Sequence, residues 1–312
     1  MNLSRTIVAV VMIVLVVLLA SPAKSVAENP QTPQPQMVIL NVRVTDPSGK
    51  AVIDVPQSRF QVTEDGVPQT ISLFMNEEIP LSYGLLIDSS GSMRDQYKAV
   101  IDTAGRIISS NKPADDTFLV RFISSDIMEV VQDTTSDKRA LFDGLAAFYI
   151  EAGQTAVIDG VYLGVDKLSK QKIDANNLRR RALVLVTDGE DRDSYYKKDD
   201  LFRILASADI QIFTIGFTKN LRGKPRERAI ELLTQLANDT GGRTFFPNSS
   251  LELERISREI INDIRTQYVI GYVPSGNDTG KSFHKVLVSV TEDPNQEKRA
   301  AITRVGYGTQ KK

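Results

Sequence analysis

The residues best suited to chemistry in this sequence are small oxygen donors that follow two very apolar segments. Asp88, Ser90 and Ser92 lie in the stretch LLIDSSGSM, and Asp188 lies in LVLVTDGED. A nucleophilic serine, a phosphate-binding loop, a metal site and a plain polar turn are all compatible with the first stretch. Carboxylates combined with neutral hydroxyls suit a hard cation such as Mg²⁺, which prefers oxygen ligands and usually retains several waters. Two carboxylates that act partly through water leave the charge of such a cation incompletely neutralised. An incoming carboxylate from a partner would neutralise it and complete the coordination.

These donors must be positioned by strands that end at one edge of a sheet. From Leu81 to about residue 267, apolar strand-like segments alternate with segments of helical spacing. The runs LSYGLLID and RALVLVTDGED are typical of strands covered on both faces. The alternation predicts an α/β fold with a doubly wound, mostly parallel sheet. Ligand sites in such sheets lie beyond the carboxyl ends of the strands, which is where Asp88 and Asp188 are expected.

Short segments with β periodicity flank this region on both sides. Residues 37–80 contain MVILNVRVTD and then two strands about the Asp65-Gly66 turn, in FQVTEDGVPQTISLFMN, while 268–312 contain YVIGYVP, SFHKVLVSVTE and RAAITRVGYG. An Asp-Gly pair between alternating segments favours a hairpin. Each flank is too small to bury much core alone. We therefore expect small all-β segments that together form one sandwich, with the α/β domain (81–267) inserted between them.

The beginning of the chain predicts export. Residues 1–27 combine a basic start, an apolar run from Thr6 to Ala20 and small residues before a cleavage site after Ala27, which is typical of a secretory signal peptide. The apolar run is shorter than the roughly 20 residues that a spanning helix needs. The Pro- and Gln-rich residues 28–36 predict a flexible spacer. We expect a secreted or periplasmic protein with no transmembrane span after cleavage.

A third segment, GQTAVIDG, contains Thr155 and lies between the two oxygen-rich stretches around Asp88 and Asp188. Together the three segments resemble the metal-ion-dependent adhesion site (MIDAS) of von Willebrand factor A domains. The order of DSSGS, GQTAVIDG and LVTDGED matches across about residues 81–267, and the flanking β segments resemble the bacterial secreted "VWFA-related" family. The resemblance implies a cation, Mg²⁺ or alternatively Mn²⁺ or Ca²⁺, bound by serine and threonine hydroxyls and by acids acting directly or through water. A ligand acid then takes the open position. The implied metal residues are Asp88, Ser90, Ser92, Thr155 and Asp188.

Each of these residues also has a local alternative role. Asp88–Ser92 could form a polar turn that caps the following helix. Thr155 could be a simple helix N-cap, and Asp188 could belong to a turn. Their joint occurrence in the matching elements favours the metal site.

Other functional classes find little support. The chain has no Cys, one His and a net charge of −1, which excludes thiolate zinc sites and gives no sign of a nucleic-acid partner. His284 lies in a predicted strand, where a structural role is expected, so a hydrolase lacks a base. No phosphate loop or dinucleotide-binding motif is present. Glu190, Asp191 and Asp193 either extend the cation site or, more simply, form a solvated acidic loop.

The sequence therefore predicts a secreted, non-enzymatic module that binds a protein through a metal ion. The metal captures an Asp or Glu side chain of the partner protein. The alternative is a structural or scaffolding envelope protein, in which the metal only stabilises the loops of the site.

Overall fold

The computed structural model of the chain describes residues 37–171, 178–249, 251–276, 281–291 and 298–309. The predicted signal peptide (1–27) and spacer (28–36) lie outside these ranges. Residues Gln36–Lys312 form one compact unit, and all the helices and strands of the described ranges belong to it.

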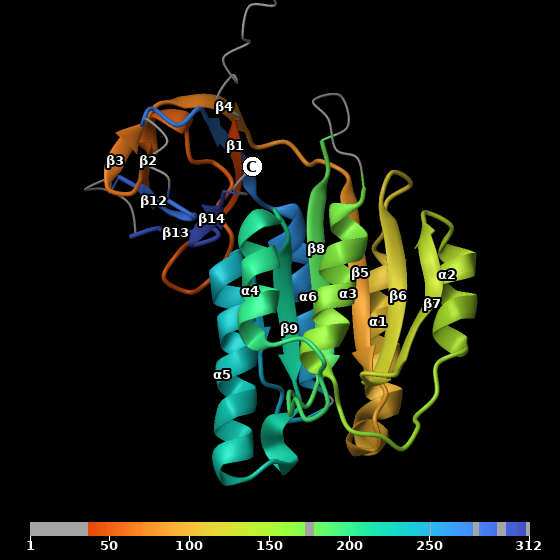
Figure 1. Cartoon of the computed structure of the whole chain (residues 1–312). Helices are drawn as coiled ribbons and strands as arrows, with labels where there is room; N and C mark the ends of the chain where they lie inside the picture. Colours follow the sequence, from red (N-terminus) through yellow and green to blue (C-terminus); the bar gives the residue numbers. More distant parts are fainter. Residues whose placement is uncertain (1–36, 172–177, 250, 277–280, 292–297, 310–312) are drawn as a thin grey trace, which may run out of the picture. The chain divides into compact units, whose positions relative to one another are not determined.

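The centre of the unit is a six-stranded sheet in the order β10-β9-β8-β5-β6-β7 (Figure 1). All neighbouring strands are parallel except β7, which runs antiparallel to β6. Because β5 and β8 are parallel neighbours, their carboxyl ends meet at the same edge of the sheet. The predicted doubly wound, mostly parallel sheet is confirmed. Its strands are β5 (Leu81–Asp88), β6 (Asp116–Ser124), β7 (Ile127–Thr135), β8 (Arg180–Thr187), β9 (Gln211–Gly216) and β10 (Arg243–Phe245).

Amphipathic helices cover both faces of this sheet. Helices α1, α2 and α6 bury their apolar side chains against one face, and α3, α4 and α5 bury theirs against the other. Figure 1 shows α3 and α4 in front of the sheet and α1 and α6 behind it. Removal of these stripes from water is the main force that holds the layers together. The helices are α1 (Tyr97–Ser109), α2 (Lys138–Ala146), α3 (Val157–Ser169), α4 (Lys198–Ser207), α5 (Gly223–Thr240) and α6 (Glu252–Arg265), with 3₁₀ turns η1 (Gln57–Arg59), η2 (Gly91–Gln96) and η3 (Thr218–Asn220).

Two antiparallel four-stranded sheets enclose a separate apolar core. One sheet has the order β13-β1-β11-β4 and the other β14-β12-β2-β3. Each sheet therefore contains strands from before and after the α/β region, since β1 pairs with β11 and β2 pairs with β12. The strands are β1 (Val38–Thr45), β2 (Phe60–Glu64), β3 (Val67–Gln69), β4 (Ile71–Met75), β11 (Tyr268–Tyr272), β12 (Phe283–Val290), β13 (Ala300–Ile302) and β14 (Gly306–Gly308).

Two segments that the sequence predicts as single strands are each divided between these sheets. The segment after the Asp65-Gly66 turn forms β3 in one sheet and β4 in the other, and RAAITRVGYG forms β13 and β14 in the same way. The turn itself has the positive φ values expected of such a hairpin, 50° at Asp65 and 85° at Gly66. Both sheets face one core, and nothing local in either segment marks where the chain passes from one sheet to the other.

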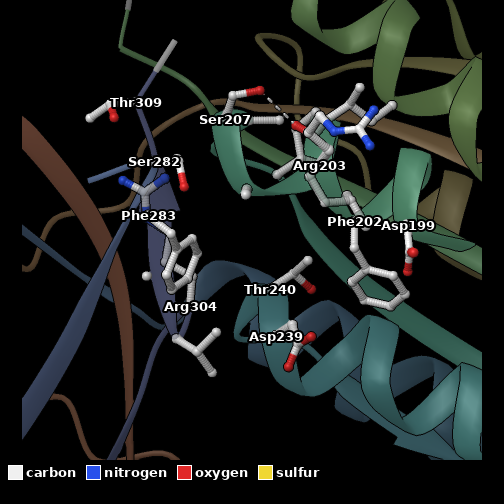
Figure 2. Close-up of a pocket in the computed structure, with 18 of the residues that line it drawn as sticks. Asp199, Phe202, Arg203, Ser207, Asp239, Thr240, Ser282, Phe283, Arg304 and Thr309 are labelled. Atoms are coloured by element: carbon white, nitrogen blue, oxygen red, sulfur yellow. Dashed lines mark hydrogen bonds between the residues drawn. The ribbon is translucent and has the colours of Figure 1, made fainter. Parts of the chain in front are cut away.

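A cavity of about 820 Å³ lies where α4 and α5 approach β12 and β14. In Figure 2, Phe202 of α4 and Phe283 of β12 lie on opposite sides of it. None of the residues proposed as metal ligands lines this cavity. Within the described ranges, no helix combines the length and the apolar character needed to cross a bilayer.

Candidate metal centre

The first part of the site is the turn that follows β5. All eight residues of β5 are buried, and the strand ends at Asp88. One Asp88 carboxylate oxygen, Oδ1, accepts a hydrogen bond from the Ser90 amide at 2.9 Å, so the chain turns sharply into η2. Met93, in the same turn, is buried in the hydrophobic core. Ser90 occupies the N-cap position of η2, but its hydroxyl makes no cap hydrogen bond. The Ser90 hydroxyl instead contacts other hydroxyl groups of the site.

Three hydroxyl groups lie in a row at this turn. The Ser90 and Ser92 Oγ atoms are 3.0 Å apart, and the Thr155 hydroxyl donates to Ser90 Oγ, also at 3.0 Å. Helix α3 begins after an N-cap at Ala156, so Thr155 is not the cap that its sequence alternative suggests. Ser90 and Thr155 are buried, whereas Ser92 is exposed. The row therefore runs from the interior to the surface.

The second carboxylate of the site follows β8. Asp188 is buried, and its Oδ1 accepts a hydrogen bond from the Glu190 amide at 3.0 Å, which is the predicted turn interaction. The residue before it, Thr187, donates its hydroxyl to Asp88 Oδ2 at 2.7 Å and accepts a hydrogen bond from the Gly189 amide at 2.9 Å. Thr187 therefore joins the two acid-bearing turns. Sequence analysis missed it; its only signal is a hydroxyl that directly follows the apolar run ALVLV of β8.

The electrostatics of this arrangement favour a cation. The pKa of Asp88 is raised to about 6, mainly by burial; the hydrogen bonds from Thr187 and Ser90 oppose this rise, and the nearby charge of Asp188 adds to it. Among the described residues there is no group of three His, Cys, Asp or Glu side chains placed to hold a metal. A cation at this edge would therefore need the hydroxyl oxygens as well as the two acids. An all-oxygen set of this kind fits Mg²⁺, Mn²⁺ or Ca²⁺.

The loop after Asp188 is fastened to the start of α3. The Thr155 carbonyl oxygen accepts hydrogen bonds from the Arg192 and Asp193 amides at 2.9 and 3.3 Å. Asp191 accepts from the Ile158 amide at 3.2 Å, and Asp193 accepts from the Ser125 amide at 3.0 Å. Burial raises the pKa of Asp191. These two half-buried acids therefore tie loops together, which is a role that the expected solvated acidic loop does not include.

His284 lies in the antiparallel sheets, outside this edge. It is buried on β12, and its Nδ1 is 3.0 Å from Asp65 Oδ2 at the β2–β3 turn. Its ring stacks against Tyr307 with centroids 5.3 Å apart. These contacts agree with the structural role expected for this residue.

Gly153 allows the Thr155 loop to lie close to β6. A Cβ atom at this position would be 2.4 Å from Cγ2 of Ile123, a buried β-branched residue with little rotamer freedom. We expect Gly153→Ala to push the loop outward, to weaken Mn²⁺ binding about tenfold and to lower the free energy of unfolding by about 1–3 kcal/mol. Calorimetric titration and urea denaturation measure the two effects.

Gly91→Ala is the matched control, since Gly91 begins η2 between Ser90 and Ser92, and a Cβ there would contact nothing within 4 Å. Its Mn²⁺ affinity should remain close to that of the wild type. Equal losses in the two variants would show that the close approach at Gly153 has no bearing on the site.

The fold and the site define an α/β domain with a cluster of hydroxyls and carboxylates at the carboxyl edge of its sheet. The family model of the von Willebrand factor type A domain matches residues 84–259, more than half of the chain. The chain therefore belongs to this family, which has a fold of the metal-dependent adhesion type. A search of curated proteins finds no match to the chain.

Solved structures of similar proteins share low sequence identity with the chain. Proximal thread matrix protein 1 from the mussel byssus is 16% identical, with a TM-score of 0.49, over 60% of this chain and 48% of that protein. BatB from Bacteroides thetaiotaomicron is 17% identical, with a TM-score of 0.44, over 58% of this chain and 97% of BatB. A von Willebrand factor type A protein from Catenulispora acidiphila is 13% identical, with a TM-score of 0.45, over 89% and 75%. The chain thus spans about half the length of the mussel protein, which in a further structure has a zinc-occupied MIDAS motif.

Proposed function

We propose that the chain is a protein-binding module whose binding depends on a divalent cation. Mg²⁺ is the expected ion, with Mn²⁺ and Ca²⁺ as alternatives. The observation that carries the proposal is the row of three hydroxyls beside two buried carboxylates, supplied by three separate loops. A bound cation would offer a coordination position to an incoming carboxylate. The residues that would hold the cation are Asp88, Ser90, Ser92, Thr155 and Asp188.

The proposed ligand is an Asp or Glu side chain of a partner protein. Ser92 is the exposed end of the hydroxyl row, so the partner would approach from that side. The proposal involves no nucleic acid or nucleotide, and it assigns no chemical step to the site. Export from the cytoplasm remains a proposal that rests on the leader-like sequence of residues 1–27.

We also propose that residues 37–80 and 268–312 form one supporting module around the inserted domain, 81–267. The pairing of β1 with β11 and of β2 with β12 supports this division. Their common apolar core supports it as well, because neither flank has enough strands to enclose such a core alone.

Titration of the chain with MnCl₂ and MgCl₂ tests the metal site. We expect the wild type to bind one ion and Ser90→Ala to bind it at least about tenfold more weakly, because the central hydroxyl of the row is lost. Glu190→Gln is the control, since the Glu190 side chain pairs with Arg192 and is not among the proposed ligands. If the wild type binds neither ion, or if Glu190→Gln costs as much as Ser90→Ala, the proposed site is wrong.

Capture of partner proteins with and without chelator tests the role of the metal. We expect the wild type to retain partners in Mg²⁺, to release them in EDTA, and to lose the same partners in the Ser90→Ala variant. If the retained proteins are identical in all three conditions, the metal has a structural role and the scaffolding alternative is correct.

A further inference from the structure

Arg121 is a buried cation close to the candidate site that the proposed function does not use. It lies on β6, beside Ile87 of β5, and its side chain is 4% exposed. The guanidinium donates through Nε and Nη2 to Glu129 Oε2 at 3.3 and 3.1 Å, and through Nη1 to Glu151 Oε2 at 3.3 Å. Arg121 therefore holds one carboxylate from β7 and one from the loop that leads to Thr155.

The same guanidinium also contacts Tyr149 of this loop. Its Nη2 donates to the Tyr149 hydroxyl at 2.9 Å, and its central carbon lies 3.9 Å from the centroid of the tyrosine ring. Phe148, one residue earlier, is buried in the core, and its carbonyl oxygen accepts a hydrogen bond from the Tyr97 hydroxyl. The segment Phe148–Glu151 is thus fixed by side chains from β6 and α1.

This segment is connected directly to the metal-site turn. The Glu151 amide donates to the Ser89 carbonyl oxygen at 3.0 Å, between the proposed ligands Asp88 and Ser90. Four residues after Glu151, the Thr155 hydroxyl makes the second connection, to Ser90 Oγ. Displacement of Glu151 would consequently move the turn and the threonine loop relative to each other.

We propose that Arg121 is a positioning residue for the metal site, an inference that rests on the proposed function. Through Glu151 it holds the Phe148–Glu151 segment against Ser89, so that the hydroxyls of Ser90 and Thr155 are already adjacent before a cation binds. Its contact with Glu129 serves only to attach β7 to β6. The Glu151 carboxylate therefore supports metal binding and the Glu129 carboxylate does not, although both pair with the same guanidinium.

Mn²⁺ titration of the chain, followed by the loss of the free-ion electron paramagnetic resonance signal, tests this division. We expect Arg121→Met and Glu151→Gln each to weaken Mn²⁺ binding about tenfold, as observed for groups that orient metal ligands. The double variant should be no weaker than Arg121→Met alone, because that change already removes the Arg121–Glu151 pair. Glu129→Gln is the matched control and should bind Mn²⁺ within about twofold of the wild type. Urea denaturation confirms that each variant is folded.

A second measurement is made in the absence of metal. The Glu151 amide should exchange with deuterium slowly in the wild type and in Glu129→Gln, and at least about tenfold faster in Arg121→Met. If Arg121→Met exchanges and binds Mn²⁺ like the wild type, or if Glu129→Gln loses as much affinity as Glu151→Gln, the inference is wrong while the proposed function stands. If the wild type does not bind Mn²⁺, the proposed function fails, and the exchange rates alone decide whether Arg121 fixes the segment.

Discussion

Asp88→Asn is expected to abolish Mg²⁺ binding without destabilising the metal-free protein. The Asp88 carboxylate is buried beside Asp188, and this environment raises its pKa to about 6. An ionised side chain in such a place is costly unless a cation compensates it. Asparagine removes the charge and keeps both contacts: its Oδ1 accepts from the Ser90 amide, and its Nδ2 donates to the Thr187 hydroxyl oxygen in place of the bond that Thr187 donated to the acid. We expect Mg²⁺ affinity to fall by more than about 100-fold, while the free energy of unfolding in EDTA changes by less than about 1 kcal/mol or increases.

Thr187→Val is the control, because we expect it to keep Mg²⁺ binding and to lose stability, which is the opposite of the result expected for Asp88→Asn. It retains both carboxylates but removes the hydroxyl that donates to Asp88 and accepts from the Gly189 amide. We expect this variant to bind Mg²⁺, though more weakly, and to lose about 1–3 kcal/mol of stability because buried polar groups lose their partners. Calorimetric titration and urea denaturation in EDTA give both quantities. A loss of more than about 3 kcal/mol in metal-free Asp88→Asn would show that the carboxylate supports the fold itself.

The strands and helices that carry the site are predictable from the sequence because their patterns are strong. Strand β5 is mostly apolar and buried at every position, as expected of a strand covered on both faces. The order of the strands in the sheet cannot be predicted in this way, because no local pattern in β5 specifies that it lies between β8 and β6. The parallel pairing of β5 and β8 is what places Asp88 and Asp188 at one edge.

The residues that arrange the proposed ligands are harder to predict than the ligands themselves. Asp88, Ser90 and Ser92 lie at alternate positions of one short segment, so their spacing can be recognised in the sequence. Thr187 and Arg121 act through contacts with residues 99 and 30 positions away, namely Asp88 and Glu151. Such pairs depend on the tertiary fold and leave no periodic or local signal.

The second large effect is expected at Arg180, the first residue of β8, at the end of the strand remote from the candidate metal site. Its side chain is fully buried, and burial lowers its pKa to about 10, so it remains charged at neutral pH. The Nε atom donates to Asn41 Oδ1 of β1 at 3.1 Å, and Nη2 donates to the Gln267 carbonyl oxygen at 3.3 Å. The Nη1 atom donates to the carbonyl oxygens of Ile264 and Arg265, at the end of α6. One guanidinium thus joins the central sheet, the antiparallel sheets and a helix C-terminus.

Arg180→Ala is therefore expected to lower the free energy of unfolding by about 3–5 kcal/mol. The change leaves Asn41 and the last carbonyl groups of α6 buried without their donor, and it removes a cation from the negative end of the helix dipole. Arg181→Ala is the neighbouring control, because Arg181 is partly exposed and makes longer hydrogen bonds to Asp209 and Leu168, at 3.2 and 3.4 Å. We expect that variant to lose about 1 kcal/mol. Equal losses in urea denaturation would show that Arg180 does not join the two parts, because its removal would then cost no more than that of an arginine whose side chain donates to Asp209 and Leu168.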